Sequence, residues 1–304
     1  MAHILERLPE GSRIAVIRLR SLGDCVLTTP ALALLKAHRP DLHIGVVVED
    51  RFRQVFDGNP DVEQTLAPSL PAVAGWGARL ALNFHGGTRS MWLLASSRAP
   101  IRAGFAHHAY SFLYNERIPR AQEILGEERP VHTAEHIASA IFWLGVPRAE
   151  IPRAKLAVAP WREGPKGPYA VVHPFASAPD KTWPAARFCE VARYLRGHGV
   201  EPVILAGPAD DLTVFGAFRT FRSTGPALAK SLIAGAQLFV GNDSGPAHIA
   251  AAFGVPVVVL FGPPDPATWA PWRTEAQVLA SRDGIARIPV EQVIAAAEAL
   301  RVRA

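Results

Sequence analysis

The chain has 304 residues, of which 49% are apolar and 19% are charged, and it carries a net charge of +5. Its length favours two domains, and its low charge argues against a disordered tail or a coiled coil. The basic excess is spread along the chain, with 18 basic and 15 acidic residues up to residue 158 and 14 and 12 after it, which argues against nucleic-acid binding.

Strands and helices are predicted to alternate through the first half of the chain. Short apolar, β-branched runs predict buried strands, and apolar residues at spacings of three and four predict helices. A helix is expected to begin near Pro30, because proline suits the first helical turn. The strands are expected at 13–19, 43–49, 78–84 and 101–105. The helices are expected at 30–38, in a short stretch up to Gly58, at 90–97 and at 132–145.

The same alternation restarts after residues 159–168, a stretch with three prolines, two glycines and no periodic pattern. We expect the linker between two domains in this stretch. After it, strands are expected at 169–174, 201–207, 237–242 and 256–262. Helices are expected at 184–199, 226–236, 246–254 and 289–304.

Strands that alternate with helices predict a mostly parallel sheet covered on both faces. Two such units of similar size predict an α/β protein built from two Rossmann-like domains that face a cleft. The expected parts are a first domain at 1–158, a linker at 159–168, a second domain at 169–288 and a C-terminal helix at 289–304. Ligands of open α/β sheets bind at the carboxyl ends of the strands, so the loops after the strands are the places to look for a site.

The run FVGNDSGPAHIAAAFGVPVVVLFGPPDP at 239–266 holds the first candidate site. Asp243 or Ser244 can cap a helix there, and Gly245 permits a close approach of a ligand. The free N–H groups and partial positive charge of such a helix start suit a diphosphate, to which His248 can add a hydrogen bond. An ordinary capped helix is the alternative. The small residues that follow favour the ligand site, because they let helix and sheet approach closely.

The run RLRSLGDCVLTTP at 18–30 holds the second candidate. Asp24 can act as a general base that removes a proton from an attacking hydroxyl, or as a charge partner for the helix start. Cys25 has no evident base beside it, so a small packed residue is favoured over a thiol nucleophile. The single glycine, Gly23, falls short of the GxGxxG pattern of dinucleotide-binding proteins.

Polar residues follow other predicted strands as well. In HPFASAPDKTWP at 173–184, Lys181 can stabilise charge on a departing phosphate, and a solvated surface lysine is the alternative. In GPADD, Asp210 and Asp211 can accept hydrogen bonds from sugar or ribose hydroxyls, or cap a helix. The run NFHGGTRS at 83–90 can line an acceptor pocket or form a plain turn.

Several kinds of chemistry are disfavoured. The sequence has no HExxH, no GKS/T loop and no DxD pair, so we expect neither metal hydrolysis, P-loop phosphoryl transfer nor metal-dependent sugar transfer. Cys25 and Cys189 lie far apart without a Cys/His cluster, and we expect no disulfide, zinc site or bound cofactor. No apolar run approaches the roughly 18 residues of a membrane span, and the first residues lack a signal-peptide stretch, which predicts a cytoplasmic protein.

These motifs resemble those of the heptosyltransferases of glycosyltransferase family 9, which build the inner core of lipopolysaccharide. RxRSLGDxxLTTPAL resembles the opening of the family's N-terminal domain, and HPxxSxxxKxWP resembles its donor-domain loop. VGNDSGPAHIAAAxGxPVVxLFGPxDP resembles its nucleotide-sugar signature. The resemblance spans almost the whole chain. It implies a GT-B fold, an inverting and metal-independent transfer, and a final helix that returns towards the N-terminal domain.

The resemblance also implies roles for single residues. Asp24 matches the family's proposed catalytic base, and Lys181 matches a phosphate-contacting lysine. The donor-binding residues are expected to be Asp211, Asp243, Ser244, Gly245 and His248, with Asp211 favoured over Asp210. We expect acceptor contacts from Arg18, Arg20, Asn83, His85 and Arg89.

The expected function is transfer of a heptose from ADP-heptose to a saccharide hydroxyl of the lipopolysaccharide inner core. Its partners would be a nucleotide-sugar donor and a lipid-linked saccharide acceptor, and such an acceptor predicts peripheral contact with the inner membrane face. Two alternatives stay open. The first is a GT-B enzyme that uses another nucleotide sugar or modifies a protein or another glycan. The second is a catalytically silent binding protein of the same fold.

Overall fold

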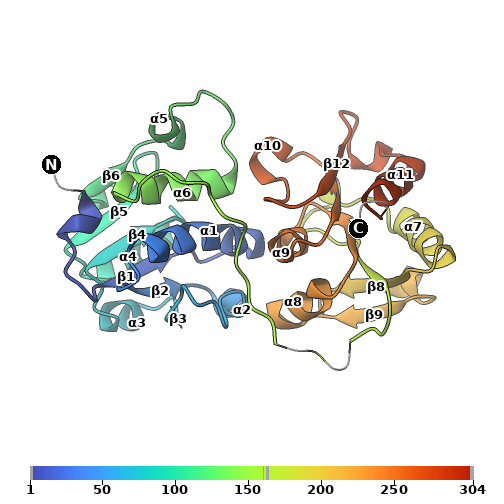
Figure 1. Ribbon diagram of the computed structural model, residues 1–304, viewed down its shortest axis with the longest axis horizontal. Helices are drawn as coiled ribbons and strands as arrows, with labels where there is room; N and C mark the ends of the chain where they lie inside the picture. The colour runs from blue at the N-terminus through green and yellow to red at the C-terminus, as the bar shows by residue number, and fades with distance from the viewer. Residues whose placement is uncertain (1–2, 160, 162–163, 302–304) are drawn as a thin grey trace. The chain divides into compact units, whose positions relative to one another are not determined.

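The computed structural model describes residues 3–159, 161 and 164–301, apart from the side chain of the last (Figure 1). The chain divides into two compact units, Met1–Lys155 and Leu156–Ala304. The last residue of the first unit, Lys155, makes three polar contacts with other residues of that unit. The N–H of Lys155 donates to Thr29 Oγ1 at 2.9 Å, its carbonyl accepts from Asn59 at 2.8 Å, and its Nζ lies 2.6 Å from Asp61. Of the linker expected at 159–168, residues 160 and 162–163 lie outside the described residues.

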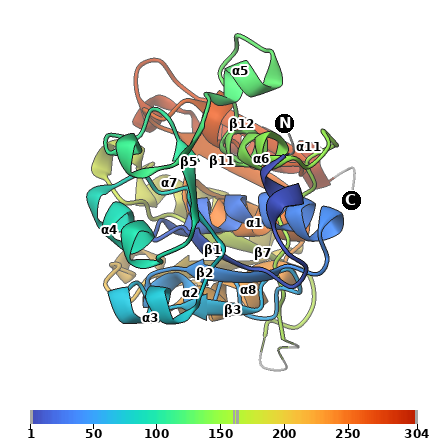
Figure 2. The same ribbon diagram turned by 90° about the vertical axis from the view of Figure 1, so that its left-hand side faces the viewer.

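Six strands of the first unit form a parallel sheet in the order β3-β2-β1-β4-β5-β6. The strands are β1 (Arg13–Ile17), β2 (His43–Val47), β3 (Gln64–Leu66), β4 (Leu80–Asn83), β5 (Ile101–Phe105) and β6 (Glu116–Ile118). Helices α3 (Leu70–Gly75) and α4 (Thr88–Ser96) cover one face, and α1 (Leu22–His38) and α6 (Thr133–Leu144) cover the other (Figure 2). The short elements are η1 (Ile4–Arg7), α2 (Asp50–Arg53), η2 (Ser111–Leu113) and α5 (Ala121–Leu125).

The second unit repeats this plan with a parallel sheet in the order β12-β11-β10-β7-β8-β9. The strands are β7 (Tyr169–His173), β8 (Glu201–Ala206), β9 (Arg219–Arg222), β10 (Leu238–Asn242), β11 (Val257–Phe261) and β12 (Ala276–Ala280). Helices α7 (Ala185–Gly197) and α11 (Val290–Arg301) share one apolar core with the sheet, and α8 (Pro226–Ala234) packs beside α9 (Gly245–Phe253). The short elements are η3 (Pro179–Lys181), η4 (Thr213–Phe215), α10 (Pro266–Trp269) and η5 (Ile285–Arg287).

The last helix, α11, contributes to the core of the second unit. Val293, Ala297 and Leu300 are buried there among side chains of α7 and the second sheet. A return of this helix to the first domain stays a prediction.

Each sheet has one point at which its strand order reverses. In the first sheet β1 lies beside β4, and in the second sheet β10 lies beside β7. The connections on either side of such a point diverge, which leaves a crevice at the carboxyl ends of the two strands. The loops after β1, β4, β7 and β10 are therefore positioned to form ligand sites.

The expected strands are all present, but the first long helix was placed wrongly. The helix α1 begins at Leu22 rather than near Pro30, which lies inside it. A proline inside a helix leaves the carbonyl four residues earlier without its N–H donor. Here the hydroxyl of Thr29 donates to that carbonyl, of Val26, at 2.8 Å. This side-chain bond lets the helix continue through the proline.

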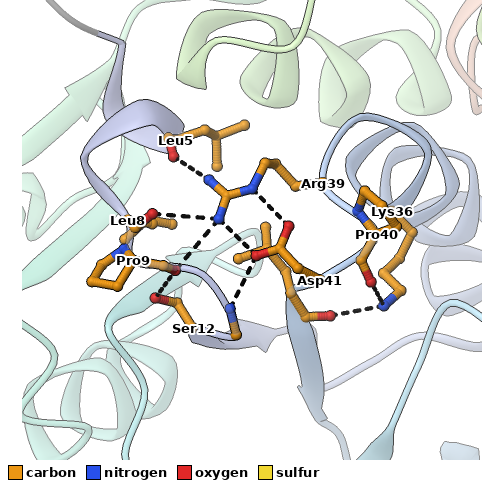
Figure 3. A network of polar contacts seen from close by, with 10 residues as sticks. Leu5, Leu8, Pro9, Ser12, Lys36, Arg39, Pro40 and Asp41 are labelled. Atoms are coloured by element: carbon orange, nitrogen blue, oxygen red, sulfur yellow. Dashed lines mark hydrogen bonds and ion pairs between the residues drawn. The ribbon is translucent and has the colours of Figure 1, made fainter.

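A polar network fixes the N-terminal segment to the first unit, at the edge of the sheet where β1 and β2 begin (Figure 3). Arg39 donates through Nε and Nη2 to the two carboxylate oxygens of Asp41, at 2.8 and 2.7 Å. Its Nη1 donates to the carbonyl of Leu5, and Nη2 donates to the carbonyl of Leu8 as well. The carboxylate of Asp41 also accepts from the N–H of Gly11 at 3.1 Å. The pair therefore joins η1 to the end of α1.

Among the described residues, no helix is both long enough and apolar enough to cross a membrane.

Candidate active site

Asp24 lies in the first turn of α1, directly after the loop that follows β1. Ser21 is the N-cap of the helix, and its N–H and hydroxyl donate to Asp24 Oδ2 at 3.1 and 2.9 Å. This is a capping box, in which a side chain of the first turn reaches back to the N-cap. Asp24 therefore has the structural role that its sequence position allowed, and a chemical role depends on what else surrounds the carboxylate.

Arg18 contacts the other oxygen of this carboxylate. Its Nη1 lies 3.1 Å from Asp24 Oδ1, and the two side chains are 9% and 19% exposed. Burial lowers the pKa of Arg18, and the charge of Asp24 opposes that effect. The Nε of Arg18 is buried and has no hydrogen-bond partner among the described residues. An unmet buried donor costs about 1–3 kcal/mol, and one of the explanations for such a group is a functional role.

Asp24 opens onto a pocket of about 530 Å³ at the reversal point of the first sheet. The pocket is lined by Arg18, Arg20, Ser21, Asp24, Arg51, Phe52 and His85. The structure thus brings together four predicted site residues: Arg18 and Arg20 from the loop after β1, Asp24 from the first turn of α1, and His85 from the loop after β4. Three guanidinium groups around one carboxylate give the pocket an excess of positive charge. It suits an oxygen-rich ligand that carries a negative charge.

Burial, together with the charges of Arg18 and Arg20, lowers the pKa of His85. The imidazole is therefore neutral at neutral pH, and it can both donate and accept a hydrogen bond. These properties suit contact with a sugar hydroxyl beside Asp24.

Two residues expected to contact the acceptor lie outside the lining of this pocket. Asn83 is fully buried: its Nδ2 donates to Ser90 Oγ at 3.1 Å, and its Oδ1 accepts from the N–H groups of His85 and Gly86 at 3.0 and 3.2 Å. It therefore holds the loop that carries His85. Arg89 lies 3.4 Å from Glu49 and lines a separate, largely apolar pocket.

Three lining residues were not predicted as site residues: Ser21, which lies inside the motif at 18–30, and Arg51 and Phe52. Arg51 and Phe52 belong to the short helix α2, just after β2. The rule that ligands collect at the carboxyl ends of strands applies to that loop as well. The position of this loop after a strand was a signal in the sequence, but the loop contained no residue pattern typical of a catalytic or binding site.

In the second unit, Lys181 lies at the end of η3, in the loop between β7 and α7. Its charge acts on Asp243, which follows β10, across the reversal point of the second sheet. Burial raises the pKa of Asp243, and the charge of Lys181 opposes that rise. The two predicted donor residues are thus close enough for an electrostatic interaction.

The helix α9 begins beside this pair. Ser244 is its N-cap by backbone conformation, yet the hydroxyl makes no capping bond and is buried without a partner among the described residues. Gly245 is the first helical residue, and His248 is buried one turn further on. A helix start with an unused hydroxyl suits a phosphate oxygen.

The two aspartates of GPADD both have partners within their own loop. Asp210 accepts from the N–H of Gly207 at 2.7 Å, and Asp211 accepts from the N–H and hydroxyl of Thr213 at 2.9 and 2.6 Å. Asp211 is exposed, and its bonds to Thr213 lower its pKa. Its second carboxylate oxygen makes no hydrogen bond among the described residues.

Within the described residues, no group of three or more His, Cys, Asp or Glu side chains is placed to hold a metal ion.

Comparison with known proteins decides the family. The profile of glycosyltransferase family 9 (heptosyltransferase) matches residues 77–287, more than half of the chain. The chain belongs to glycosyltransferase family 9. It is 28% identical over 294 residues to lipopolysaccharide heptosyltransferase 3 of Escherichia coli, and the alignment covers 84% of each protein. This family 9 protein is therefore a glycosyltransferase.

Solved structures agree with the fold. A glycosyl transferase family 9 protein from Veillonella parvula DSM 2008 matches with a TM-score of 0.83 at 24% identity, over 96% of this chain and 98% of that one. The E. coli ADP-heptose lps heptosyltransferase II matches with a TM-score of 0.79 at 21% identity, over 96% and 99%. The prediction of an α/β, GT-B-like protein with two Rossmann-like domains is confirmed.

Proposed function

We propose that this family 9 glycosyltransferase transfers a heptose from ADP-heptose to a saccharide hydroxyl of the lipopolysaccharide inner core, with inversion and without a metal. The observation that carries the proposal is the carboxylate of Asp24, held in an arginine-lined pocket at the reversal point of the first sheet. The donor and acceptor follow from the names of the relatives, one a lipopolysaccharide heptosyltransferase and one an ADP-heptose lps heptosyltransferase.

Asp24 is the general base of the proposed reaction. Its Oδ2 already accepts two hydrogen bonds from Ser21, whereas Oδ1 accepts one from Arg18. A carboxylate oxygen has two lone pairs, so Oδ1 is the atom with an acceptor position left for the substrate proton. The acceptor hydroxyl would lose its proton to Oδ1 as its oxygen attacks the anomeric carbon. The arginines of the pocket favour an acceptor that carries phosphate or carboxylate groups.

The second unit would bind the donor and stabilise the leaving group. As the anomeric C–O bond breaks, negative charge grows on the nucleotide diphosphate. Lys181, the start of α9 at Gly245 and the hydroxyl of Ser244 are proposed to bind that charge. His248 and Asp243 would complete the donor site, and the free oxygen of Asp211 would accept from a sugar or ribose hydroxyl. Attack from the opposite face gives inversion through an oxocarbenium-like transition state.

A lipid-linked acceptor would bring the protein to the inner membrane face, as a cytoplasmic protein in peripheral contact. Vesicles of anionic lipid should carry the protein upward in flotation at low salt and release it at high salt. Absence of flotation at both salt concentrations would contradict this part of the proposal.

The test of the function is a comparison of donors. ADP-heptose should raise the Tm more than GDP- and UDP-sugars do, because only a bound ligand stabilises the fold by mass action. Incubation with ADP-heptose and a deacylated inner-core saccharide should then give a product heavier by one heptose in mass spectrometry. A larger Tm shift with another nucleotide sugar would replace the proposed donor. Binding of donor without any product would favour the silent binding protein.

A further inference from the structure

The loop that carries Lys181 is held at both of its ends by one buried side chain. Asn242 is the last residue of β10 and is fully buried. Its Nδ2 donates to the carbonyl of Pro174 at 3.0 Å, where the loop leaves β7. Its Oδ1 accepts from the N–H of Trp183 at 3.1 Å, where the loop reaches α7. One amide therefore closes residues 174–183 into a fixed loop.

Asn242 also connects the two parts of the proposed donor site. It directly precedes Asp243 and Ser244, which lead into α9, and it bonds to both ends of the Lys181 loop. Its side chain is fully buried, so it would not contact a ligand itself. Its effect on a ligand would act through the position of the loop.

Gly262 fixes the middle of the same loop. It follows β11, and a Cβ built on it would lie 2.4 Å from the carbonyl oxygen of Asp180 and 3.2 Å from Cα of Lys181. The atoms in the way are backbone atoms, so a side chain at 262 would displace the loop itself. The closeness of the two backbones thus depends on a residue without a Cβ.

The far end of the loop is anchored in the core. Trp183 is fully buried, and its Nε1 donates to the carbonyl of Ile288 at 3.0 Å. Within the loop, the N–H of Lys181 and the hydroxyl of Thr182 both donate to the carbonyl of Ala178, at 3.1 and 2.8 Å. A displacement at 262 or a break at 242 would therefore be transmitted to Lys181 rather than absorbed at Trp183.

We propose that Asn242 and Gly262 are positioning residues that set the place of Lys181 beside Asp243 and the start of α9. The proposal rests on the phosphate role proposed for Lys181. A displacement of about 1 Å in a group that binds a reacting part of the substrate can lower a rate by up to 100-fold, so such positioning has a measurable effect.

The test is a double-mutant cycle on nucleotide affinity, measured by titration calorimetry with whichever of ADP, GDP and UDP binds most tightly to the wild-type protein. Lys181→Ala should weaken binding by about 10- to 150-fold, since a charged contact to phosphate is worth about 1.5–3 kcal/mol and about 1.4 kcal/mol is a factor of ten. Gly262→Ala and Asn242→Asp should each weaken binding by about three- to tenfold in the wild-type background. Each should change it less than twofold in the Lys181→Ala background, because residues that act through one group are not additive.

The corresponding nucleoside without phosphates is the ligand control, and its affinity should not change in any variant. Gly235→Ala is the matched control, because its Cβ would lie 2.5 Å from the hydroxyl of Tyr169. Gly235 precedes β10, at the opposite end of the strand from Asn242. This variant should lower the Tm and leave nucleotide affinity unchanged.

Each outcome bears on the proposal. Equal losses from Gly262→Ala in both backgrounds would show that it acts on the fold rather than through Lys181, and would overturn the inference alone. If Asn242→Asp does not fold, Gly262→Ala decides by itself, and the reverse also holds. Unchanged affinity in Lys181→Ala would overturn the inference together with the phosphate role, and absence of binding by all three nucleotides would overturn the proposed donor site as a whole.

Discussion

Two carboxylates of the first unit occupy the same place in their helices but have different surroundings. Asp24 in α1 and Glu135 in α6 are both the third residue of a capping box, and each forms an ion pair with an arginine. Their side chains are 19% and 17% exposed. Only Asp24 lies among the residues that line the arginine-rich pocket. Asp24 and Glu135 therefore share the structural role of a capping residue, and only Asp24 is also placed for the proposed chemical role.

Asp24→Asn should lower kcat by at least about 100-fold, because an amide cannot take the proton of the acceptor hydroxyl. Nucleotide affinity should stay within about twofold, because the proposed donor site lies in the other unit. Glu135→Gln is the control. It should lower the Tm by about as much as Asp24→Asn does, and it should leave kcat unchanged. Product formation by Asp24→Asn at the wild-type rate would remove this residue from the mechanism.

Cys25 follows Asp24 and is fully buried. Burial raises the pKa of its thiol to about 12, and Arg18 opposes that rise only in part. A protonated, inaccessible thiol is a poor nucleophile. We therefore expect kcat of Cys25→Ala within about threefold of wild type, since only a small packed side chain is lost. Iodoacetamide at pH 7.5 should leave Cys25 unmodified in the folded protein, as judged by peptide mass mapping. Rapid alkylation of Cys25 with loss of activity would show that its thiol is accessible and reactive, and would support a role as nucleophile.

At the scale of elements, each unit ends a central strand in a buried asparagine. Asn83 ends β4 and bonds to the loop of His85, and Asn242 ends β10 and bonds to the loop of Lys181. Both strands flank the point at which their sheet reverses. An amide can donate and accept at once, so one side chain satisfies the backbone of a loop that leaves the sheet. The same arrangement thus holds a loop with candidate site residues in each of the two units.

The central strands could be predicted from the sequence because they are buried on both faces. The strands β1, β7, β10 and β11 are near-continuous apolar runs, which is the pattern of an interior parallel strand. The strands β3, β6, β9 and β12 were missed, and all four are edge strands. An edge strand is partly exposed and needs no apolar run, so its position depends on the neighbour to which it bonds.

The polar network around Arg39 and Asp41 could not be predicted either. Its partners, the carbonyls of Leu5 and Leu8, are backbone groups that carry no sequence signal. Hydrogen bonds from Arg39 hold the pKa of Asp41 well below its usual value. The folded state therefore favours the ionised carboxylate, and this contribution to stability is present above the unfolded pKa of about 3.9 and is lost as the pH falls towards the folded value.

Asp41→Asn should lower the Tm at pH 7 by about 3–6 °C, for a loss of about 1.5 kcal/mol in hydrogen bonds to charged groups. The difference in Tm between wild type and variant should be constant from pH 7 to pH 5 and should shrink below pH 4. Thermal melts followed by circular dichroism measure it. The exposed Asp283 is a control, and Asp283→Asn should leave the Tm unchanged. A difference that grows as the pH falls would contradict the assigned role.

For the whole molecule, the sequence predicted which loops carry candidate site residues better than it predicted which of their residues line the pocket. Every motif that it singled out follows a strand of one of the two sheets, as the rule for open sheets predicts. Distances between loops depend on strand order, which the sequence does not state. The placement of Arg51 in the pocket and the bonds of Asn83 to the loop of His85 could be found only from the folded chain.

The division of labour between the units leads to a prediction for the whole protein. The proposed donor groups all belong to the second unit, and the proposed base and acceptor groups all belong to the first. ADP alone should therefore slow hydrogen exchange first in residues 174–183 and at the start of α9. At 100 times its Kd, ADP adds about 2.7 kcal/mol of stability to the state that binds it, enough for clear protection.

Asp24→Asn should show the same protection by ADP as the wild-type protein, and Lys181→Ala should show less at equal ADP concentration. Mass spectrometry of peptides from both units measures the effect, with adenosine as the control that lacks phosphates. Protection by ADP confined to peptides around residues 18–30 and 83–90 would place the nucleotide in the first unit. The roles of the two units would then have to be exchanged, because the leaving diphosphate must lie where the nucleotide binds.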